Sequence, residues 1–447
     1  MRAGYQAYFA GGCVRDLLLA REPLDYDVAT SATPDEVQRL FEKTFAVGAS
    51  FGVVLVAAED GSESKPVEVA TFRNDGAYSD GRRPDAVRYT PDPREDVARR
   101  DFTINGLLLD PLKNVPVEEA VLDFVGGRDD LRAKLVRAIG DPRRRFAEDK
   151  LRLLRAVRFA ARLDFTIESK TMEAVREQAA SITQVSAERV REELTRILTE
   201  GHARRGFELL DSSGLLRHVL PEVARMHGVE QPPQYHPEGD VWTHTRMLLD
   251  HLPPDASATL AWGMLLHDVG KPATFTPPRD EYDRIRFHDH VRVGAAIAHD
   301  LLRRLRFSSD DSAQVLALIE HHMQFGDVMQ MKQSTLKRFL RLPNFKEHLA
   351  LHYADVMSSH RDLSRYEFAK SRYEELGEEQ IRPRLLLTGR ELIAAGYRPG
   401  PQFKAMLEAA EDAQLEGRVH SAAEALALLR ERFDAVSAEE QERTHGG

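Results

Sequence analysis

The residues in this chain whose types could do chemistry begin with two carboxylates, Asp25 and Asp27, which follow a glycine pair ending at Gly12. Alternate residues of a strand face the same side, so both carboxylates can hold Mg²⁺ ions that bridge a triphosphate and an attacking hydroxyl. Gly12 lets a phosphate approach the backbone where a helix begins, and Arg15 adds positive charge. Glu68, on a later strand, is a candidate third carboxylate. Solvent-facing acids are the alternative, but the preceding glycine turn and arginine favour a metal.

A second group of polar side chains suits a bound nucleotide. The run RRDFTING places Arg100, Asp101 and Asn105 close together. Guanidinium groups beside an asparagine amide suit the phosphates and the ribose of a nucleotide. A salt-bridged helix start is the alternative interpretation, and this motif alone does not decide between the two.

The segment EDKLRLLRAVR has the residue types needed to select a base. We predict an uninterrupted helix over residues 146–163, on which Asp149 and Arg152 lie one turn apart, side by side. The carboxylate can accept from an exocyclic amino group while the guanidinium donates to the adjacent ring nitrogen. Cytosine and adenine carry these two groups side by side, whereas guanine and uracil carry a carbonyl beside an N–H and do not match. Arg155 and Arg158 lie further round the helix, where they can reach a triphosphate. An exposed salt bridge is the alternative.

Histidine and aspartate residues in the second half of the chain have the types of a mixed nitrogen and oxygen metal site. The candidate ligands come from three predicted helices, one of which carries the adjacent pair: His244, His267, Asp268 and Asp355. A second metal could take ligands from His290 and from His321 or His322, and Lys271 could contact a phosphate. A single buried histidine is more often a core residue, but four candidates in this order favour a metal.

These residues must be positioned by two kinds of structure. Up to residue 139 the pattern is α/β, with strands predicted at 8–10, 25–28, 52–56 and 67–69, helices at 14–19 and after Thr33, and a turn-rich mobile loop over 74–84. Beyond Gly140 the chain is nearly all helical. We therefore expect an α+β multidomain protein divided as follows: 1–139, 140–229, 230–365 and 366–447.

Composition restricts the class of protein. The chain of 447 residues is 42% hydrophobic and 30% charged, with a net charge of −10 that argues against a globally basic nucleic-acid binder. Residues 128–162 nevertheless hold twelve Lys or Arg against five Asp or Glu, a net +7, which phosphate contact would require. No apolar run approaches the length of a bilayer, residues 1–10 do not form a signal peptide, and the single cysteine fits a reducing cytoplasm.

Four segments in order, GGCVRD, LDYDVAT, RRDFTINGLLLD and EDKLRLLRAVRFAARL, resemble the motif set of class II tRNA nucleotidyltransferases and bacterial poly(A) polymerases. VSAERVREEL and LLDSSGLLRHVLPE are similar to the neck of that family. The resemblance implies a polymerase-beta-like head with a mixed sheet, an all-helical neck and tail, and CTP, ATP and the tRNA acceptor end as partners. It implies that Asp25 and Asp27 hold the catalytic Mg²⁺. The positions where the family binds nucleotide are Gly12, Arg15, Arg100, Asp149, Arg152, Arg155 and Arg158.

The family divides by product. The segment NDGAYSDGRRPDAV resembles the flexible loop of enzymes that add the terminal A, and the end of the chain, SAEEQERTHGG, lacks a basic tail of the kind poly(A) polymerases tend to carry. Both features favour complete CCA addition. An enzyme that adds only A, or a poly(A) polymerase, stays open.

Residues 235–365 resemble the HD superfamily of metal-dependent phosphohydrolases, in the order HTRMLLDHL, LLHDVGK, FHDHVRVGA and LHYADVMSSH. The resemblance implies a divalent transition metal that activates water for attack on a phosphoester. Whether the domain is active, or is a helical scaffold that helps to hold tRNA, stays open. An HD-type phosphohydrolase with an RNA-binding head is the alternative from another functional class.

Overall fold

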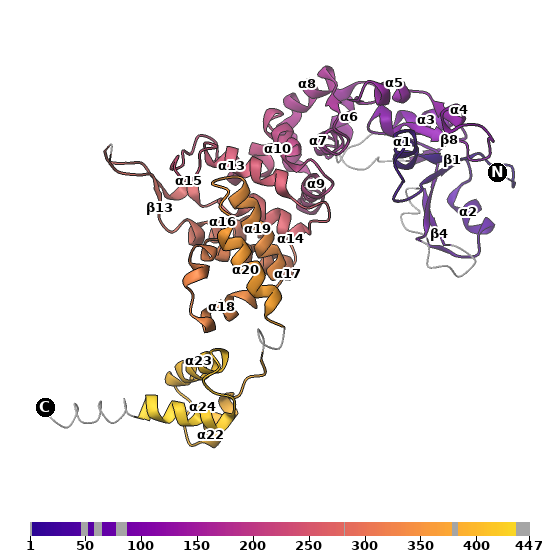
Figure 1. Cartoon of the computed structure of the whole chain (residues 1–447). Helices are drawn as coiled ribbons and strands as arrows, with labels where there is room; N and C mark the ends of the chain where they lie inside the picture. Colours follow the sequence, from indigo (N-terminus) through magenta and orange to yellow (C-terminus); the bar gives the residue numbers. More distant parts are fainter. Residues whose placement is uncertain are drawn as a thin grey trace. The chain divides into compact units, whose positions relative to one another are not determined.

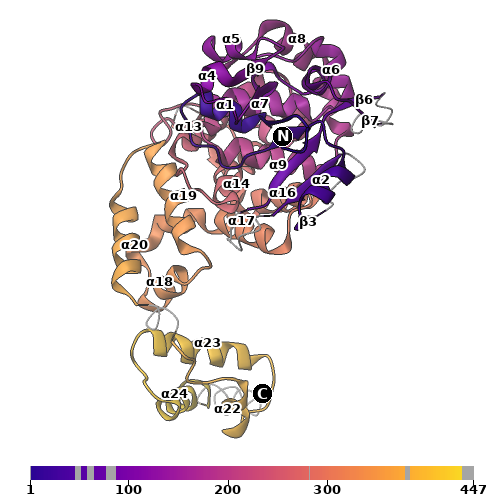
Figure 2. The same cartoon turned by 90° about the vertical axis from the view of Figure 1, so that its right-hand side faces the viewer.

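The computed structural model describes residues 2–45, 52–57, 65–76, 87–280, 282–377 and 383–434 (Figures 1 and 2). The chain divides into two compact units. Unit 1 comprises Met1–Val229, Thr245–Trp262 and His299–Ser308, and unit 2 comprises Glu230–His244, Gly263–Ala298 and Ser309–Gly447. The division into four domains that we predict from the sequence stays a prediction.

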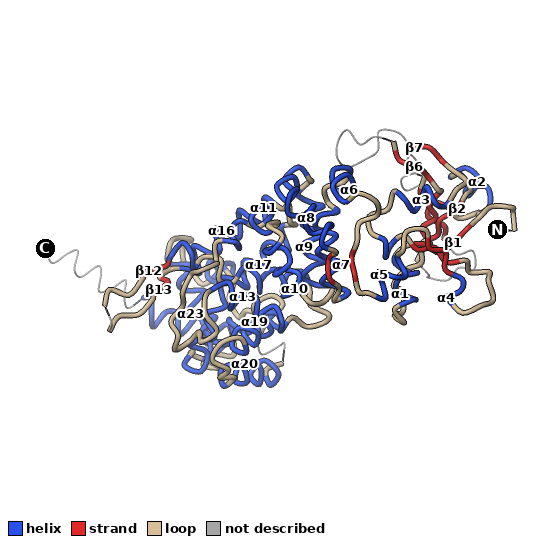
Figure 3. Tube along the Cα trace, turned by 90° about the horizontal axis from the view of Figure 1, so that it is seen from above, coloured by secondary structure: helices blue, strands red, loops and turns tan. Residues whose placement is uncertain are grey.

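A mixed seven-stranded sheet forms the first part of unit 1, in the order β3-β4-β5-β2-β1-β8-β9. Within it β2 pairs with β5 in parallel, and the other pairs are antiparallel. The strands are β1 (Ala7–Ala10), β2 (Val28–Thr30), β3 (Thr44–Phe45), β4 (Val53–Val56), β5 (Val67–Thr71), β8 (Leu107–Leu109) and β9 (Val121–Asp123). Figure 3 shows how these strands, in red, gather in the N-terminal part of the chain.

Asp25 and Asp27 lie just before β2 rather than on it, so the predicted strand over 25–28 is wrong in its extent. The backbone still continues the β1–β2 pairing by one residue, since the Ala10 amide donates to the Asp27 carbonyl oxygen at 2.9 Å. This pairing fixes the Asp27 backbone beside the end of β1.

Short helices connect the strands of the head: α1 (Gly12–Leu18), α2 (Pro34–Leu40), α3 (Pro93–Ala98), η2 (Thr103–Asn105), α4 (Val117–Ala120) and α5 (Gly127–Arg132). The predicted start after Thr33 is confirmed, with Pro34 in the first turn and a capping box between Thr33 and Glu36. The start of the predicted loop, residues 74–75, lies in β6 (Arg73–Asp75), which forms a hairpin with β7 (Val87–Tyr89). The part of that loop from 77 to 84 lies outside the described residues.

Helices make up most of the rest of unit 1, with β10 (Leu135–Val136) pairing in parallel with β11 (Thr166–Ile167). The elements after β10 include α6 (Pro142–Glu148), α7 (Arg152–Leu163), α8 (Ser169–Gln178), η3 (Ala179–Gln184), α9 (Ala187–Thr199), α10 (Ala203–Ser212), α11 (Leu216–Val219) and α12 (Pro221–Ala224). The uninterrupted helix predicted over 146–163 is therefore wrong. It breaks at Asp149, whose backbone is extended at φ −139° and ψ 106°.

Unit 2 is helical apart from a hairpin of β12 (Phe275–Thr276) and β13 (Arg286–Phe287). Among the described residues, the helices from 241 onward are α13 (Val241–Leu248), η4 (Leu249–His251), α14 (Ala258–Leu266), α15 (Lys271–Thr274), α16 (His290–Arg304), α17 (Ser309–His321), η5 (His322–Gln330), α18 (Gln333–Leu340), α19 (Phe345–Met357), α20 (Ser364–Glu375), α22 (Gly389–Ala394), α23 (Gln402–Leu415), α24 (Ala422–Leu429) and the π-helical turn η6 (Arg430–Asp434). Of these, η4 and parts of α13, α14 and α16 belong to unit 1. Among the described residues, no helix combines the length and the hydropathy of a membrane span.

Candidate functional site

A cavity of about 570 Å³ in unit 1 brings together the head residues singled out in the sequence. Its lining includes Gly12, Arg15, Asp25, Asp27, Arg100, Asp101, Asn105, Asp149, Arg152, Arg155 and Arg158. These residues come from the β1–α1 turn, the segment before β2, the segment after α3 and the α6–α7 region. Positions far apart in the sequence thus line one polar cavity.

The carboxylates at one side of this cavity repel each other. Burial, Glu68 and Asp25 raise the pKa of Asp27 to about 6, against the opposing charge of Arg100. Glu68 on β5 is therefore close enough to Asp27 to act on it electrostatically, as a third carboxylate must. A carboxylate cluster that disfavours its own negative charge fits a divalent cation, which oxygen ligands of this kind bind well.

Arg15 is held in place at the start of α1. Its side chain is 3% exposed, its Nε donates to Asp16 at 2.8 Å, and its Nη1 donates to Asn105 at 2.7 Å. Burial lowers the pKa of Arg15, with Asp16 acting in the opposite direction. Gly11 has φ 73°, and a Cβ there would lie 3.0 Å from the Arg100 guanidinium, so both the turn and the close approach require glycine.

Arg155 and Arg158 on α7 are paired with acids. Two nitrogens of Arg155 donate to one Asp101 oxygen at 2.8 and 2.6 Å. Burial would raise the pKa of Asp101, but Arg155 outweighs it and the value falls to about 2. Burial lowers the pKa of Arg158 to about 10, although Glu193 on α9 lies 3.1 Å away. These pairs hold the guanidinium groups at the cavity wall before any ligand binds.

Phe159 is a cavity residue that the sequence interpretation missed. The guanidinium carbons of Arg15, Arg155 and Arg158 lie 5.3, 5.2 and 4.7 Å from the centre of its ring. A ring face attracts cations at such distances, so Phe159 helps to gather three guanidinium groups on one side of the cavity. Its position next to Arg158 was the available signal.

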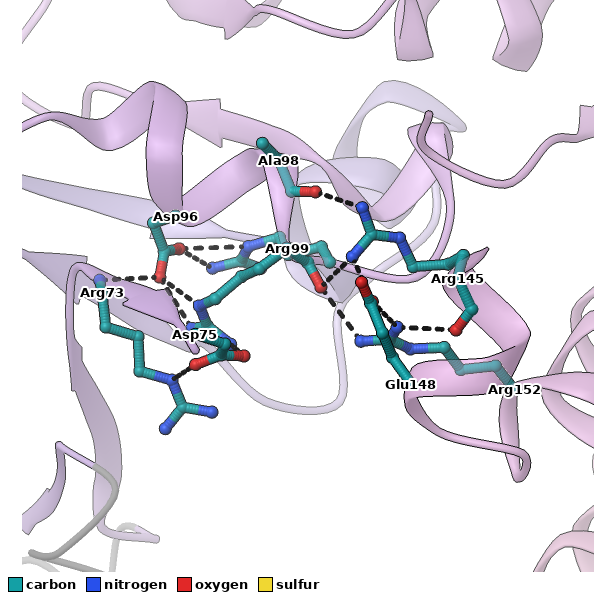
Figure 4. Close-up of polar contacts among 9 residues, drawn as sticks. Arg73, Asp75, Asp96, Ala98, Arg99, Arg145, Glu148 and Arg152 are labelled. Atoms are coloured by element: carbon teal, nitrogen blue, oxygen red, sulfur yellow. Dashed lines mark hydrogen bonds and ion pairs between the residues drawn. The ribbon is translucent and has the colours of Figure 1, made fainter. Parts of the chain in front are cut away.

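Asp149 and Arg152 both line the cavity, but they are not a pair on one helix face as the sequence interpretation expected. Asp149 ends α6 and Arg152 begins α7. One Asp149 oxygen accepts from the Leu151 amide at 3.1 Å, and the other accepts from Arg189 on α9 at 2.9 Å. The Arg152 guanidinium donates instead to Glu148 and to two backbone carbonyls (Figure 4).

A second cavity, of about 540 Å³, contains the histidine–aspartate centre of unit 2. Its lining includes His267, Asp268, His290, His322 and Asp355. Close groups of ligand atoms form around Asp268, one with His244 and His267 and the other with His290 and His322. His267 and Asp268 lie in the turn between α14 and α15, so the helix predicted to carry this pair ends before it.

The histidines of this centre are oriented by backbone carbonyls. The Nδ1 atoms of His267, His290 and His322 lie 2.9, 3.0 and 2.7 Å from the carbonyl oxygens of Met264, Phe287 and Ile319. Because a carbonyl only accepts, each Nδ1 is the donor in these hydrogen bonds, which leaves Nε2 as the ring atom that can face a ligand.

Several buried atoms of the centre make no well-directed hydrogen bond among the described residues: Nε2 of His244, His267 and His290, and Oδ1 of Asp268. Carboxylate oxygens nevertheless lie 3.1 Å from His244 Nε2 and 3.2 Å from His267 Nε2. Lone pairs that are buried and unpaired are costly in a protein interior. Nitrogen and carboxylate ligand atoms turned toward one centre fit a divalent metal ion. The ligands expected from the sequence lie here together, with Asp355 3.1 Å from His244 Nε2, and their binding of a metal stays a prediction.

The structure corrects one member of the predicted second ligand set. His322, and not His321, lies with Asp268 and His290. His321 ends α17 and its ring lies against His348, with ring centres 6.0 Å apart. His322 begins η5, and its ring faces Asp268 and His290 instead.

Glu238 and His236 are residues of the centre that the sequence interpretation missed. One Glu238 oxygen lies 2.7 Å from His244 Nδ1 and 2.9 Å from His236 Nδ1. Burial raises the pKa of Glu238, but the hydrogen bonds from His236 and His244 outweigh it and the value falls to about 2. A carboxylate behind a histidine orients the ring and strengthens it as a ligand. No periodic pattern marks this loop, so only its position before His244 was a signal.

Lys271 lies beside the centre and is almost fully buried. Its Nζ lies 2.7 Å from Asp268 and 2.7 Å from the Gln231 side-chain oxygen. Burial acts to raise the pKa of Asp268, but His267 and Lys271 hold it well below its usual range. A Cβ at Gly270 would lie 2.1 Å from the His290 carbonyl, so this turn packs directly against the start of α16.

A mixed sheet with a carboxylate- and arginine-lined cavity, together with a histidine–aspartate centre in a helical fold, defines a nucleotidyltransferase joined to an HD domain. Family models agree with both parts: the "Poly A polymerase head domain" matches residues 7–137, the "Probable RNA and SrmB- binding site of polymerase A" matches 164–226, and the "HD domain" matches 234–358. Residues 7–137 and 164–226 are thus similar to two parts of poly(A) polymerases, and residues 234–358 are similar to HD domains.

Curated relatives cover part of the chain. A CCA-adding enzyme of Oceanobacillus iheyensis is 44% identical over 207 residues, which is 46% of this chain and 49% of that protein. A CCA-adding enzyme of Bacillus velezensis is 41% identical over 231 residues, or 52% of this chain and 55% of that protein. The alignments thus span about half the length of the curated relatives.

Solved structures match over nearly the whole chain. The crystal structure of the Bacillus stearothermophilus CCA-adding enzyme in complex with CTP has a TM-score of 0.74 at 26% identity, covering 98% of this chain and 96% of that one. The Thermotoga maritima CCA-adding enzyme complexed with tRNA_CCA has a TM-score of 0.56 at 18% identity, covering 97% and 92%, which shows the shared fold.

Proposed function

We propose that this chain adds CCA to tRNA 3′ ends from CTP and ATP, without a template, in the cytoplasm. The observation that carries the proposal is one cavity lined by Asp25 and Asp27, by Asp149 and Arg152, and by further arginines. It thus holds candidate groups for metal, base and triphosphate. The similar enzyme solved with CTP, and the relatives that carry the CCA-adding name, support the same substrates.

In this proposal, Asp25 and Asp27 would hold Mg²⁺, which would stabilise negative charge where the nucleotidyl group is transferred. Arg155 and Arg158, already oriented by Asp101 and Glu193, bind the triphosphate. The tRNA 3′-hydroxyl oxygen forms a bond to the α-phosphorus and loses its proton to solvent, and the bond from that phosphorus to the bridging oxygen breaks with release of pyrophosphate. Arginines that are fixed in advance lose little freedom on binding, which favours the in-line geometry.

Asp149 and Arg152 select the base in this proposal. Cytosine and adenine each present an amino group beside a ring nitrogen, which a carboxylate and a guanidinium complete. Uracil and guanine present a carbonyl beside an N–H. The carboxylate then faces the carbonyl, which also only accepts, and the guanidinium faces the N–H, which also only donates. The two side chains come from the end of α6 and the start of α7, so their spacing depends on that break.

An incorporation assay tests the proposal. Transfer RNAs that end at the discriminator base, at C and at CC are incubated with CTP, with ATP and with both. Growth of the bare end by CCA, stopping after three nucleotides, is the expected result. Growth only from the CC end would make the chain an A-adding specialist. An unbounded A tail on generic RNA would make it a poly(A) polymerase.

We propose a second function, metal-dependent phosphoester hydrolysis, for the histidine–aspartate centre. The unpaired donor atoms described above support a metal there, and the exposed Arg284 and Arg365 line the same cavity and favour an anionic substrate. Tyr235, 50% exposed, lines it as well and offers a face for a base to stack on.

The protein loaded with Mn²⁺ should hydrolyse a phosphoester, and His267→Ala should abolish this while sparing nucleotide addition. If hydrolysis survives in that variant, the centre is not its site.

A further inference from the structure

Arg145 on α6 lies outside the lining of the head cavity, yet it is bonded to the same groups as Arg152. Figure 4 shows the two guanidinium groups converging on Glu148 and on the Arg99 carbonyl oxygen. One Glu148 oxygen accepts from Arg145 at 2.7 Å and from Arg152 at 3.0 Å. The Arg99 carbonyl accepts from them at 3.3 and 3.0 Å.

Arg145 also connects α6 to two further backbone segments of unit 1. Its Nη2 donates to the Ala98 carbonyl at 2.7 Å, at the end of α3, and its Nε donates to the Ile139 carbonyl at 3.2 Å. The Arg145 side chain is only 13% exposed. A planar guanidinium that donates to several fixed carbonyls leaves those carbonyls little freedom to move.

The shared acceptors are themselves anchored. Arg99, whose carbonyl accepts from both arginines, pairs through its own side chain with Asp96 at 2.6 Å, which is 1% exposed. The backbone carbonyl of Arg145 accepts in turn from Arg152 at 3.0 Å. Each of the three groups that hold Arg152 is therefore either part of Arg145 or bonded to it.

We propose that Arg145 is a positioning residue for base selection, because it sets the acceptors that fix Arg152 at the wall of the nucleotide cavity. The inference rests on the proposed nucleotide addition and adds a residue to its specificity. Without the Arg145 guanidinium, Glu148 and the Arg99 carbonyl lose a shared donor, and Arg152 can turn its donors away from the base. The wrong bases are then opposed less strongly, while Asp25 and Asp27 are untouched.

The test compares kcat/KM for CTP, UTP, ATP and GTP on tRNA ends in Arg145→Ala and in the wild-type protein. We expect the preferences for CTP over UTP and for ATP over GTP to fall about tenfold, the lower part of the range for one base contact. A purely structural role would lower kcat/KM for all four nucleotides in proportion and leave both ratios unchanged. That result would overturn the proposal.

Arg143→Ala is the matched control, since Arg143 lies on the same helix and pairs with Glu177 at the surface, 53% exposed. It should keep both ratios at the wild-type value. Arg145→Lys retains a positive charge near Glu148, but its side chain cannot donate to all the carbonyls. Its CTP/UTP and ATP/GTP ratios should therefore lie between those of the wild type and of Arg145→Ala. If Arg145→Ala folds poorly, the ratios of Arg145→Lys remain the test. Wild-type ratios in Arg145→Lys would overturn the proposal. If the wild-type protein adds no nucleotide, the proposed function fails instead.

Discussion

The head cavity and the histidine–aspartate centre differ in how far their side chains are already hydrogen-bonded. In the head cavity the cationic side chains already have partners: Arg15 is bonded to Asn105, Arg155 to Asp101 and Arg152 to Glu148. In the histidine–aspartate centre, His290 Nε2 and Asp268 Oδ1 are buried ligand atoms with no hydrogen-bond partner among the described residues. The three arginines of the head are thus hydrogen-bonded without a ligand, whereas these two atoms of the centre are not.

The difference follows from the ligands that each site fits. A nucleotide binds by many charge-assisted hydrogen bonds, and arginines held by acids and carbonyls keep their remaining donors in a fixed geometry. A metal ion needs lone pairs, and a lone pair already used in a hydrogen bond is not available to it. Substitutions should therefore damage geometry in the head and affinity in the centre.

The largest expected effect is in the head. Asp25→Ala or Asp27→Ala should lower nucleotide incorporation at least about 10³-fold, because the loss of a metal ligand removes several kcal/mol of transition-state stabilisation. Incorporation is measured on a tRNA that ends at the discriminator base, with CTP and ATP together.

Binding of tRNA, measured by gel shift, should stay within about twofold of wild type, since the Arg128–Arg162 region that carries the excess positive charge is unchanged. The metal content of the histidine–aspartate centre should also be unaffected. Persistent incorporation in both variants would mean that these aspartates do not hold the catalytic metal.

The next largest effect is expected on the metal affinity of the histidine–aspartate centre. His267→Ala or Asp268→Ala removes a donor around which the close ligand groups of the centre form. The affinity for a divalent transition metal should fall more than about 100-fold, beyond the effect of changing a group behind a ligand. Metal content after dialysis against a buffered metal solution measures it. Nucleotide incorporation that fell in parallel would show that the two sites are not independent.

A smaller effect is expected at Glu238, which holds His244 from behind. In Glu238→Gln the neutral amide cannot support His244 Nδ1 as a carboxylate does, so metal affinity should fall about 10–100-fold. The exposed Glu230 belongs to the same segment, and Glu230→Gln is the control. Equal affinities in the two variants would mean that Glu238 does not tune the centre.

Sequence patterns predicted the head cavity well because its residues lie in short motifs whose order matched a family. They failed at Asp149, where the apolar spacing continued through 146–163. The Asp149 side chain accepts from the Leu151 amide, and a local bond of this kind offers the backbone an alternative to a helix.

In the centre, adjacent histidines made His321 and His322 equally good candidates. The choice between them depends on where α17 ends, and the boundary of a helix is difficult to place from sequence. Glu238 lies in a loop, where neither periodicity nor spacing marks a side chain that folding brings against His244.

The smallest predicted effect concerns a histidine of unit 2 outside both cavities. His348 is 1% exposed, and burial lowers its pKa to about 4, with His321 acting in the same direction. The unfolded chain keeps a value near 6.5 and so binds the proton first as the pH falls. Stability from this group is therefore complete above about pH 6.5 and is lost as the pH falls toward 4, by up to about 1.4 kcal/mol per pH unit.

His348→Leu should flatten the acid limb of the unfolding-midpoint profile between pH 7 and 5, whereas His299→Leu, at a side chain 60% exposed, should not. An unchanged acid limb in His348→Leu would mean that His348 takes up its proton in the folded chain, and that the acid sensitivity of unit 2 arises from other groups.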